Sequence, residues 1–233
     1  MISINTNYGS LFAAKSAGAA QKTMNNAMER LSSGLRINNA KDDAAGQGIA
    51  TRITAQIQGL EMASRNASDA QAMIDTAEAA HQEVHAMLLR MREIAVQASN
   101  GTLRAADRTA LNEEIGALEK EIKNISDNTT FAGLQINAST QTVFQIGRSS
   151  SNTLTVIFKD FDTSAIGADV GMTTAGTARS ALTKIDAAIS TISTRRGELG
   201  AFSNRLSSTI ANLDNISVNI ASARGRIQDT DFA

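Results

Sequence analysis

The chain has 233 residues, of which 42% are hydrophobic and 19% charged, and its net charge of −1 gives no indication of the basic face that binds nucleic acid or an anionic membrane. It contains no cysteine, which excludes disulfides and thiolate metal sites, and its apolar runs are too short for insertion in a membrane. It also contains no proline and no tryptophan, so the composition favours long uninterrupted helices around an aliphatic core.

The first 20 residues do not form a secretory signal peptide. They lack both the basic start and the continuous apolar stretch that such a signal needs.

The segment that begins at Ala44 repeats apolar residues at spacings of three and four. Two rows, read every seventh residue, continue for about six heptads and predict a coiled-coil seam. The predicted helix runs from Ala44 to Ser99, about 80 Å, and should stop at Asn100-Gly101, where glycine accepts the left-handed conformation. The rows consist of Ile53, Leu60, Ala67, Ile74, His81, Leu88 and Ala95, and of Ala63, Ala70, Ala77, Val84, Met91 and Ala98.

Two further helices are predicted, a shorter one from Asp107 to about Ser126 and a long one from Ala178 to Ile227. In the long one every seventh residue is Ile or Leu, from Ile185 to Ile227. Helices with such seams need one another to bury their apolar faces. The sequence therefore predicts a mainly α fold, an elongated antiparallel coiled-coil or helical bundle.

A small β-hairpin is predicted at about residues 131–160, because the apolar period changes there. TVFQI (142–146) and LTVIF (154–158) are rich in β-branched and aromatic residues, and GRSSSN (147–152) between them supplies a turn. Leu154, Val156 and Phe158 should share one face. The Gly-, Ala- and Thr-rich segment from Phe161 to Thr177 is predicted to be a surface connection.

The stretch ERLSSGLRINNAKDDAAGQGIA (29–50) interrupts the apolar pattern. Ser33-Gly34 indicates a helix end, and Asp42 and Asp43 indicate the start of the next helix, where carboxylates cap free N–H groups. We therefore expect residues 1–43 to form a terminal arm with a connecting turn, and residues 44–233 to form the helical core domain.

Four segments make this chain resemble the bacterial flagellins: SINTN (3–7), the stretch 29–50, LRMREIAVQASNGT (89–102) and ASARGRIQDTDFA (221–233). The resemblance implies a structural subunit, not an enzyme and without a cofactor or metal, that polymerises into the helical tube of the flagellar filament for motility. It implies export through the hollow filament to the outside of the bacterium. The implied partners are other flagellin subunits, the flagellar export machinery and its chaperone.

Two departures from the family pattern are visible. The gap where flagellins carry variable outer domains is only about 161–177, so those domains are expected to be absent. Family members also continue past the DTDFA motif as a C-terminal arm, which pairs with the N-terminal arm. We expect the chain to be truncated at Ala233, with the chaperone site lost together with that arm.

The resemblance also implies recognition by host receptors. Arg90, Ile94 and Glu114 fall on the family's contact positions for a Toll-like receptor, and residues 29–50 match a peptide epitope sensed by plants. Arg90 and Ile94 are four residues apart on one helix, and we expect them to provide the exposed arginine and the apolar anchor that a binding hot spot needs.

Two alternative functions stay open at the level of sequence. A hook–filament junction protein shares terminal segments with flagellin, and a coiled-coil signalling or adaptor module would share the heptads. The pattern His81-Gln-Glu-Val-His85 resembles the zinc motif H-E-x-x-H, but its glutamate is one place late, so a packed helix is the favoured reading.

Overall fold

The computed structural model describes residues 7–136 and 139–231. The chain forms two compact units, a terminal unit of Met1–Glu61 with Asn215–Ala233 and a central unit of Met62–Asp214. Among the described helices, none has an apolar stretch long enough to cross a lipid bilayer.

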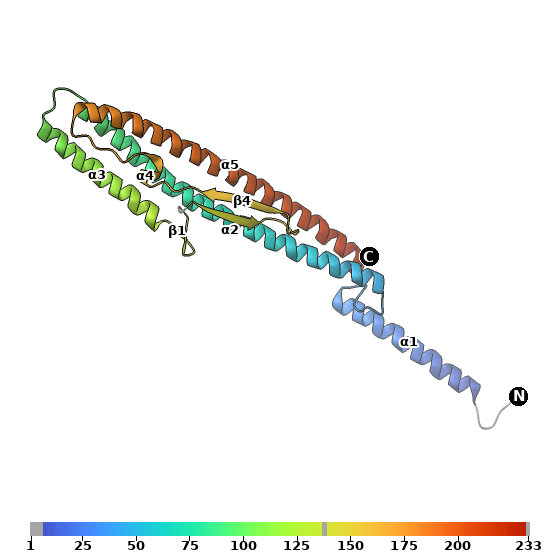
Figure 1. Cartoon of the computed structure of the whole chain (residues 1–233). Helices are drawn as coiled ribbons and strands as arrows, with labels where there is room; N and C mark the ends of the chain where they lie inside the picture. Colours follow the sequence, from blue (N-terminus) through green and yellow to red (C-terminus); the bar gives the residue numbers. More distant parts are fainter. Residues whose placement is uncertain (1–6, 137–138, 232–233) are drawn as a thin grey trace. The chain divides into compact units, whose positions relative to one another are not determined.

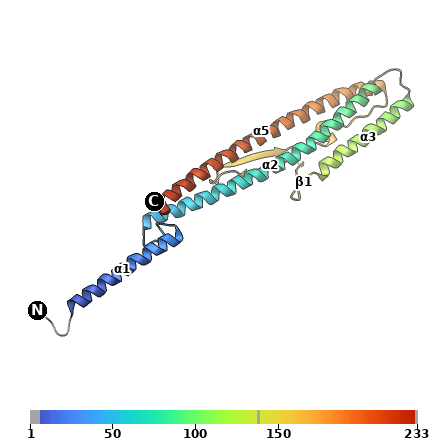
Figure 2. The ribbon, with the colours of Figure 1, turned by 180° about the vertical axis from the view of Figure 1, so that it is seen from behind.

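The central unit is built on two long helices, α2 (Ala44–Ala98) and α5 (Ala175–Gln228), and the shorter α3 (Ala105–Asn128). Within the central unit they run side by side in both ribbon views (Figures 1 and 2). The predicted mainly α bundle is confirmed, and the predicted helix ends agree with the observed ones to within three residues.

The predicted seams form the core of the central unit. All members of the second row of α2 are buried, and so are those of the first row from Leu60 onward. In α5 the buried members of the row are Ile185, Ile192, Leu199, Leu206 and Leu213. Small alanines alternate with Leu, Ile and Met in these seams, which lets the helices approach closely while the larger side chains fill the space between them.

The predicted hairpin is present as β3 (Thr140–Gln145) and β4 (Thr153–Phe158), paired antiparallel. Leu154, Val156 and Phe158 are all buried, as the alternation predicted. They belong to one hydrophobic cluster with residues of α2 and α5, including Ile74 and Leu206. The hairpin thus packs one face on the helices.

A second, very short hairpin follows α3 and was not predicted. β1 (Thr130–Phe131) and β2 (Leu134–Gln135) are joined by Ala132 and Gly133, which both have positive φ angles, 49° and 81°. A two-residue loop with both φ angles positive matches the twist of the flanking strands.

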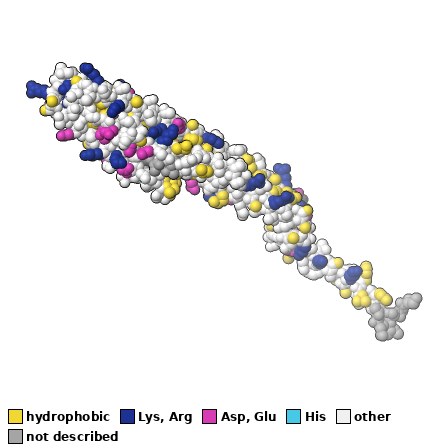
Figure 3. Space-filling model, viewed as in Figure 1, with side chains coloured by type: hydrophobic (Ala, Val, Ile, Leu, Met, Phe, Trp, Pro, Cys, Tyr) yellow, Lys and Arg dark blue, Asp and Glu magenta, His cyan; other side chains and the backbone are white. Residues whose placement is uncertain are grey.

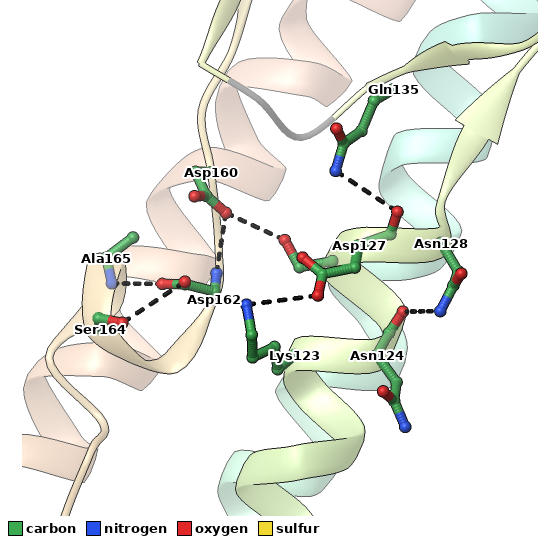
Figure 4. Close-up of polar contacts among 10 residues, drawn as sticks. Lys123, Asn124, Asp127, Asn128, Gln135, Asp160, Asp162, Ser164 and Ala165 are labelled. Carbon is green, nitrogen blue, oxygen red and sulfur yellow. Dashed lines mark hydrogen bonds and ion pairs between the residues drawn. The ribbon is translucent and has the colours of Figure 1, made fainter.

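The prediction that the segment from Phe161 to Thr177 is a surface connection is wrong. It contains α4 (Thr163–Ile166), capped by Asp162, whose carboxylate accepts a hydrogen bond from the Ala165 N–H at 2.7 Å (Figure 4). Five apolar side chains of the segment are buried in the same core cluster as α2, α3 and α5: Phe161, Ile166, Ala168, Val170 and Met172. The segment is therefore part of the core.

After α4, residues 168–172 run along α3, and we call them the strap. The Val170 N–H donates to Glu119 Oε1 at 2.9 Å, and the Met172 N–H donates to Asn112 Oδ1 at 2.7 Å. Burial raises the pKa of Glu119, while its bond with Val170 acts in the opposite direction. Side chains of α3 thus satisfy backbone donors that the buried strap would otherwise leave without partners.

The terminal unit contains α1 (Tyr8–Ser33), which begins at the cap residue Asn7 and ends at Gly34 with φ of 70°. The predicted stop at Ser33-Gly34 is confirmed. None of the residues of α1 is buried. Its exposed large apolar side chains are Tyr8, Leu11, Phe12, Met24, Met28 and Leu31.

Two carboxylates hold the turn between α1 and α2, and of the two predicted helix caps only Asp43 caps α2, whereas Asp42 binds the turn itself. Asp42 Oδ2 accepts from the backbone N–H groups of Asn38 and Asn39, and these bonds, that of Asn39 foremost, lower the pKa of Asp42. Asp43 Oδ1 accepts from the N–H groups of Ala45 and Gly46 at the start of α2. The opening of the helix is thereby capped.

The same turn pairs with the end of α5 inside the terminal unit. Leu35 forms an antiparallel bridge with Asp229, and the Arg36 guanidinium donates to the Ile227 carbonyl at 2.6 Å. Ile37 lies beneath, 1% exposed. Residues near both ends of the chain therefore stabilise each other there.

Candidate functional site

The surface shared by α2 and α3 is organised by Arg90. Its Nη2 lies 2.8 Å from Glu114 Oε1 on α3, and its Nη1 lies 3.0 Å from Glu93 Oε2 on α2. The side chains of Arg90 and Glu114 are 53% and 42% exposed, so the pair contributes little stability. The hydrogen bond with Glu114, and to a smaller extent that with Glu93, raises the pKa of Arg90. Both bonds fix the orientation of its guanidinium group.

Ile94 does not lie beside Arg90 on the surface. It is 1% exposed and belongs to the core cluster that also contains Met91 and Ala95. Four residues advance a helix by 400°, so Arg90 lies at the edge of the exposed face and Ile94 falls on the core side. The expected role of Ile94 as an exposed apolar anchor is wrong; receptor contact itself stays a prediction.

The exposed apolar residues of this part of α2 are Leu89 and Val96, 44% and 49% exposed. They are seven residues apart and therefore lie on one face of the helix. The sequence contained this signal, because both residues fall outside the two seam rows. They are the apolar neighbours that a partner on this face would meet.

The end of α2 differs from the predicted glycine stop. The helix ends at Ala98, and Gly101 is not among the residues with a positive φ angle. Instead, Arg108 of α3 donates from Nε to the Ala98 carbonyl at 3.0 Å and from Nη2 to the Asn100 carbonyl at 2.7 Å. A guanidinium therefore satisfies carbonyls that a left-handed glycine cap would have served.

Ion pairs also join α2, and the residue that follows β4, to α5. Arg92 pairs with Asp186 at 2.6 Å, and the half-exposed Lys159 pairs with Glu198 at 3.1 Å. Figure 3 shows positive and negative side chains interspersed over the visible face of the central unit. This face therefore carries no large area of one sign of charge for steering a charged ligand.

The two histidines do not form a zinc site. His81 is 3% exposed and packs against Phe161, with ring centroids 4.7 Å apart, in the seam position of α2. In residues 7–136 and 139–231 no group of three or more His, Cys, Asp or Glu side chains is arranged to hold a metal ion.

These features define a class of protein: a helical structural module that acts through its surfaces. Its side chains form seams, caps and ion pairs between helices, and α1 exposes large apolar residues.

The comparisons with known proteins identify the family. The bacterial flagellin N-terminal helical region matches residues 4–142, and the bacterial flagellin C-terminal helical region matches residues 182–233. The chain belongs to the bacterial flagellin family. It is 43% identical over 235 residues to a flagellin of Halalkalibacterium halodurans, covering 99% of this chain and 86% of that one. It is 39% identical over 252 residues to a flagellin of Bacillus subtilis, covering 92% and 82%.

One solved structure agrees with this assignment, and a second shares the fold. The crystal structure of Bacillus cereus flagellin superposes with a TM-score of 0.60 at 31% identity, over 69% of this chain and 94% of that chain. A structure described as a flagellar hook-associated protein from Vibrio parahaemolyticus gives a TM-score of 0.70 at 12% identity, over 81% and 100%. The second likeness concerns the fold alone.

Proposed function

We propose that this chain is a structural subunit of the flagellar filament, exported from the bacterium by the flagellar machinery. Outside the cell it polymerises with other flagellin subunits into the helical tube used for motility. Repeated heterologous contacts that do not close into a ring generate such a tube. Residues 1–43 would form the inner part of the filament and residues 44–233 the helical core domain around it.

The exposure of α1 supports this proposal independently of the family assignment. α1 is a helix of 26 residues without a buried residue. Met24, Met28 and Leu31 follow one another at spacings of four and three, so they form an apolar stripe on one face. An isolated helix of this kind is marginal in water. Packing against helices of neighbouring subunits would cover the stripe.

Two other functions were considered. A hook–filament junction protein has a compatible fold, but the identity over nearly the whole chain is to flagellins. A coiled-coil signalling or adaptor module would share the seams, yet the two flagellin regions together match most of the sequence. Both therefore explain less than a filament subunit does.

The stripe can be tested in the bacterium that encodes this chain, by changing the chromosomal gene to Met24→Asp. A carboxylate on the apolar face would be buried without a partner in the filament, so we expect few or no filaments by electron microscopy. Asn26→Asp is the matched control, because it adds the same charge about 200° around the helix. Filaments of normal number and length in the Met24→Asp strain would contradict the proposal.

We further propose that the α2–α3 surface of the free subunit is read by a host Toll-like receptor. Arg90 and Glu114 are exposed and held in one orientation by their ion pair. The apolar contact would come from Leu89 and not from the buried Ile94. Ile94 would contribute by holding α2 against α3 beneath the surface.

A further inference from the structure

His81 is the one polar member of the two α2 seam rows. The other positions hold Ala, Ile, Leu, Val or Met, yet this ring is 97% buried, with 3% of its surface exposed. Its Nδ1 atom is buried and has no hydrogen-bond partner among the described residues. A polar group of this kind costs stability and calls for an explanation.

The ring lies where three parts of the central unit meet. Its centroid is 4.7 Å from that of Phe161, which follows β4, at an interplanar angle of 59°. A small hollow lies beside the ring. Its lining comes from the end of β4 and the residue after it (Ile157, Phe158 and Lys159) and from α5 (Arg195, Glu198, Leu199 and Phe202). At about 10 Å³ the hollow has room for about one water molecule and not for an organic ligand. The imidazole ring can itself gain or lose a proton.

The charged groups around the ring are already engaged with one another. Lys159 pairs with Glu198, and Arg196 pairs with Glu78 of α2 at 2.7 Å. The Arg195 guanidinium donates to the Asp160 carbonyl. Glu78 retains a buried Oε2 without a partner, but its charge is already balanced by Arg196.

The carboxylate of Asp160 is also occupied. Its Oδ1 accepts from Ser126 Oγ at 3.0 Å. It also accepts from the Asp162 N–H at 3.1 Å (Figure 4). Among the described residues, the carboxylates of Glu78, Asp160 and Glu198 thus have other partners, and none of them forms a hydrogen bond or ion pair with His81. A proton on the ring would place a cation in a buried site close to Arg195 and Arg196.

The electrostatics agree with this geometry. Burial, and then repulsion from Arg195 and Arg196, lowers the pKa of His81 from 6.5 to about 4. In an unfolded chain the ring gains its proton as the pH falls through about 6.5. The folded state resists that proton until the pH approaches 4, so acid favours any state in which the ring reaches water.

We propose that His81 makes this junction acid-sensitive, so that protonation of its ring releases Phe161 and the root of the β3–β4 hairpin from α2 and α5. The seams of α2 and α5 outside the junction contain no other histidine and hold the rest of the unit together. Acid would thus weaken the contacts of Phe161 and the hairpin with α2 and α5 before it unfolds the helical bundle.

The chain has only two histidines, so NMR can follow both ring signals through a pH titration of the folded protein. His85→Gln removes one signal and identifies the other. We expect the His81 signal to titrate near pH 4. Titration of His81 at pH 6 or above in the folded protein would overturn the proposal.

The second measurement is the amide protection factor of β4 residues, compared at pH 6.5 and pH 4 in the wild type and in His81→Leu. We expect protection in β4 to fall at least tenfold in the wild type and to fall less in His81→Leu, with α5 around Leu213 as internal reference. Carboxylates titrate in both proteins, so the difference isolates His81. The same loss of protection in both proteins would also overturn the proposal.

Discussion

Asn112 Oδ1 on α3 accepts a hydrogen bond from the backbone N–H of Met172 at 2.7 Å, which fixes the buried strap before α5 begins. Asn112→Ala would leave that donor buried without a partner, since Met172 has no exposed surface. We expect a loss of about 1–3 kcal/mol in the free energy of unfolding, measured by urea denaturation.

Glu113→Ala is the control for this change, because its exposed side chain is next in the sequence. It should alter stability by no more than about 0.5 kcal/mol. If Asn112→Ala were as stable as Glu113→Ala, the strap would not depend on α3 as described.

Leu206 tests the long seam of α5. It has no exposed surface and lies in the cluster that joins α2, α5 and the hairpin. Leu206→Ala should lower the free energy of unfolding by about 2–5 kcal/mol, because it removes buried contacts and leaves a cavity. The exposed neighbour substitution Ser207→Ala should leave the melting temperature nearly unchanged, and equal melting temperatures for the two variants would rule out the seam assignment.

The fold could be predicted largely because heptad spacing reports burial directly. Each seam position depends on neighbours three or four residues away, so the rows through Leu88, Met91 and Leu206 could be identified without knowledge of the partner helices. The hairpin was predicted from an equally local change of period. Helix ends marked by Gly34 and Asp43 followed from capping chemistry.

The predictions failed where contacts between segments distant in the sequence determine the local structure. Residues 161–177 look like a loop by composition, although Ala168, Val170 and Met172 alternate with a period of two, as a buried extended segment does. Arg108 donates to carbonyls at the end of α2, and Asn112 accepts from a backbone N–H of the strap. No local pattern predicts such bonds between distant segments. Ile94 was misplaced because four residues separate positions by 40° around a helix, enough to cross from surface to core.

The pKa of His81 gives a pH dependence with a definite sign. Because the folded pKa is about 4 and the ordinary value is 6.5, titration of His81 does not reduce the free energy of unfolding above pH 6.5. It lowers that free energy as the pH falls from 6.5 toward 4, where the unfolded chain binds the proton and the folded chain does not. The loss reaches at most about 3 kcal/mol for a shift of this size. Unfolding curves at several pH values should show this slope in the wild type, whereas a His81→Leu variant with the same slope would show that other groups cause it.

Arg90→Ala tests receptor recognition. If Arg90 is a binding hot spot, its removal should weaken the affinity of the Toll-like receptor for the free subunit about 5- to 30-fold, equivalent to about 1–2 kcal/mol. The melting temperature should barely change, because the ion pair with Glu114 is exposed. Arg92→Ala, which breaks the exposed pair with Asp186, controls for loss of a positive charge. Unchanged affinity of Arg90→Ala would remove this residue from the proposed contact surface.

The central claim, that this chain builds a filament whose contacts cover α1, is tested most directly by cryo-electron microscopy of filaments sheared from the bacterium that encodes it. We expect mass spectrometry to find the chain in the filaments and the map to show Met24, Met28 and Leu31 packed against helices of neighbouring subunits. Filaments that lack this chain, or a map in which α1 keeps its apolar stripe in solvent, would contradict the claim.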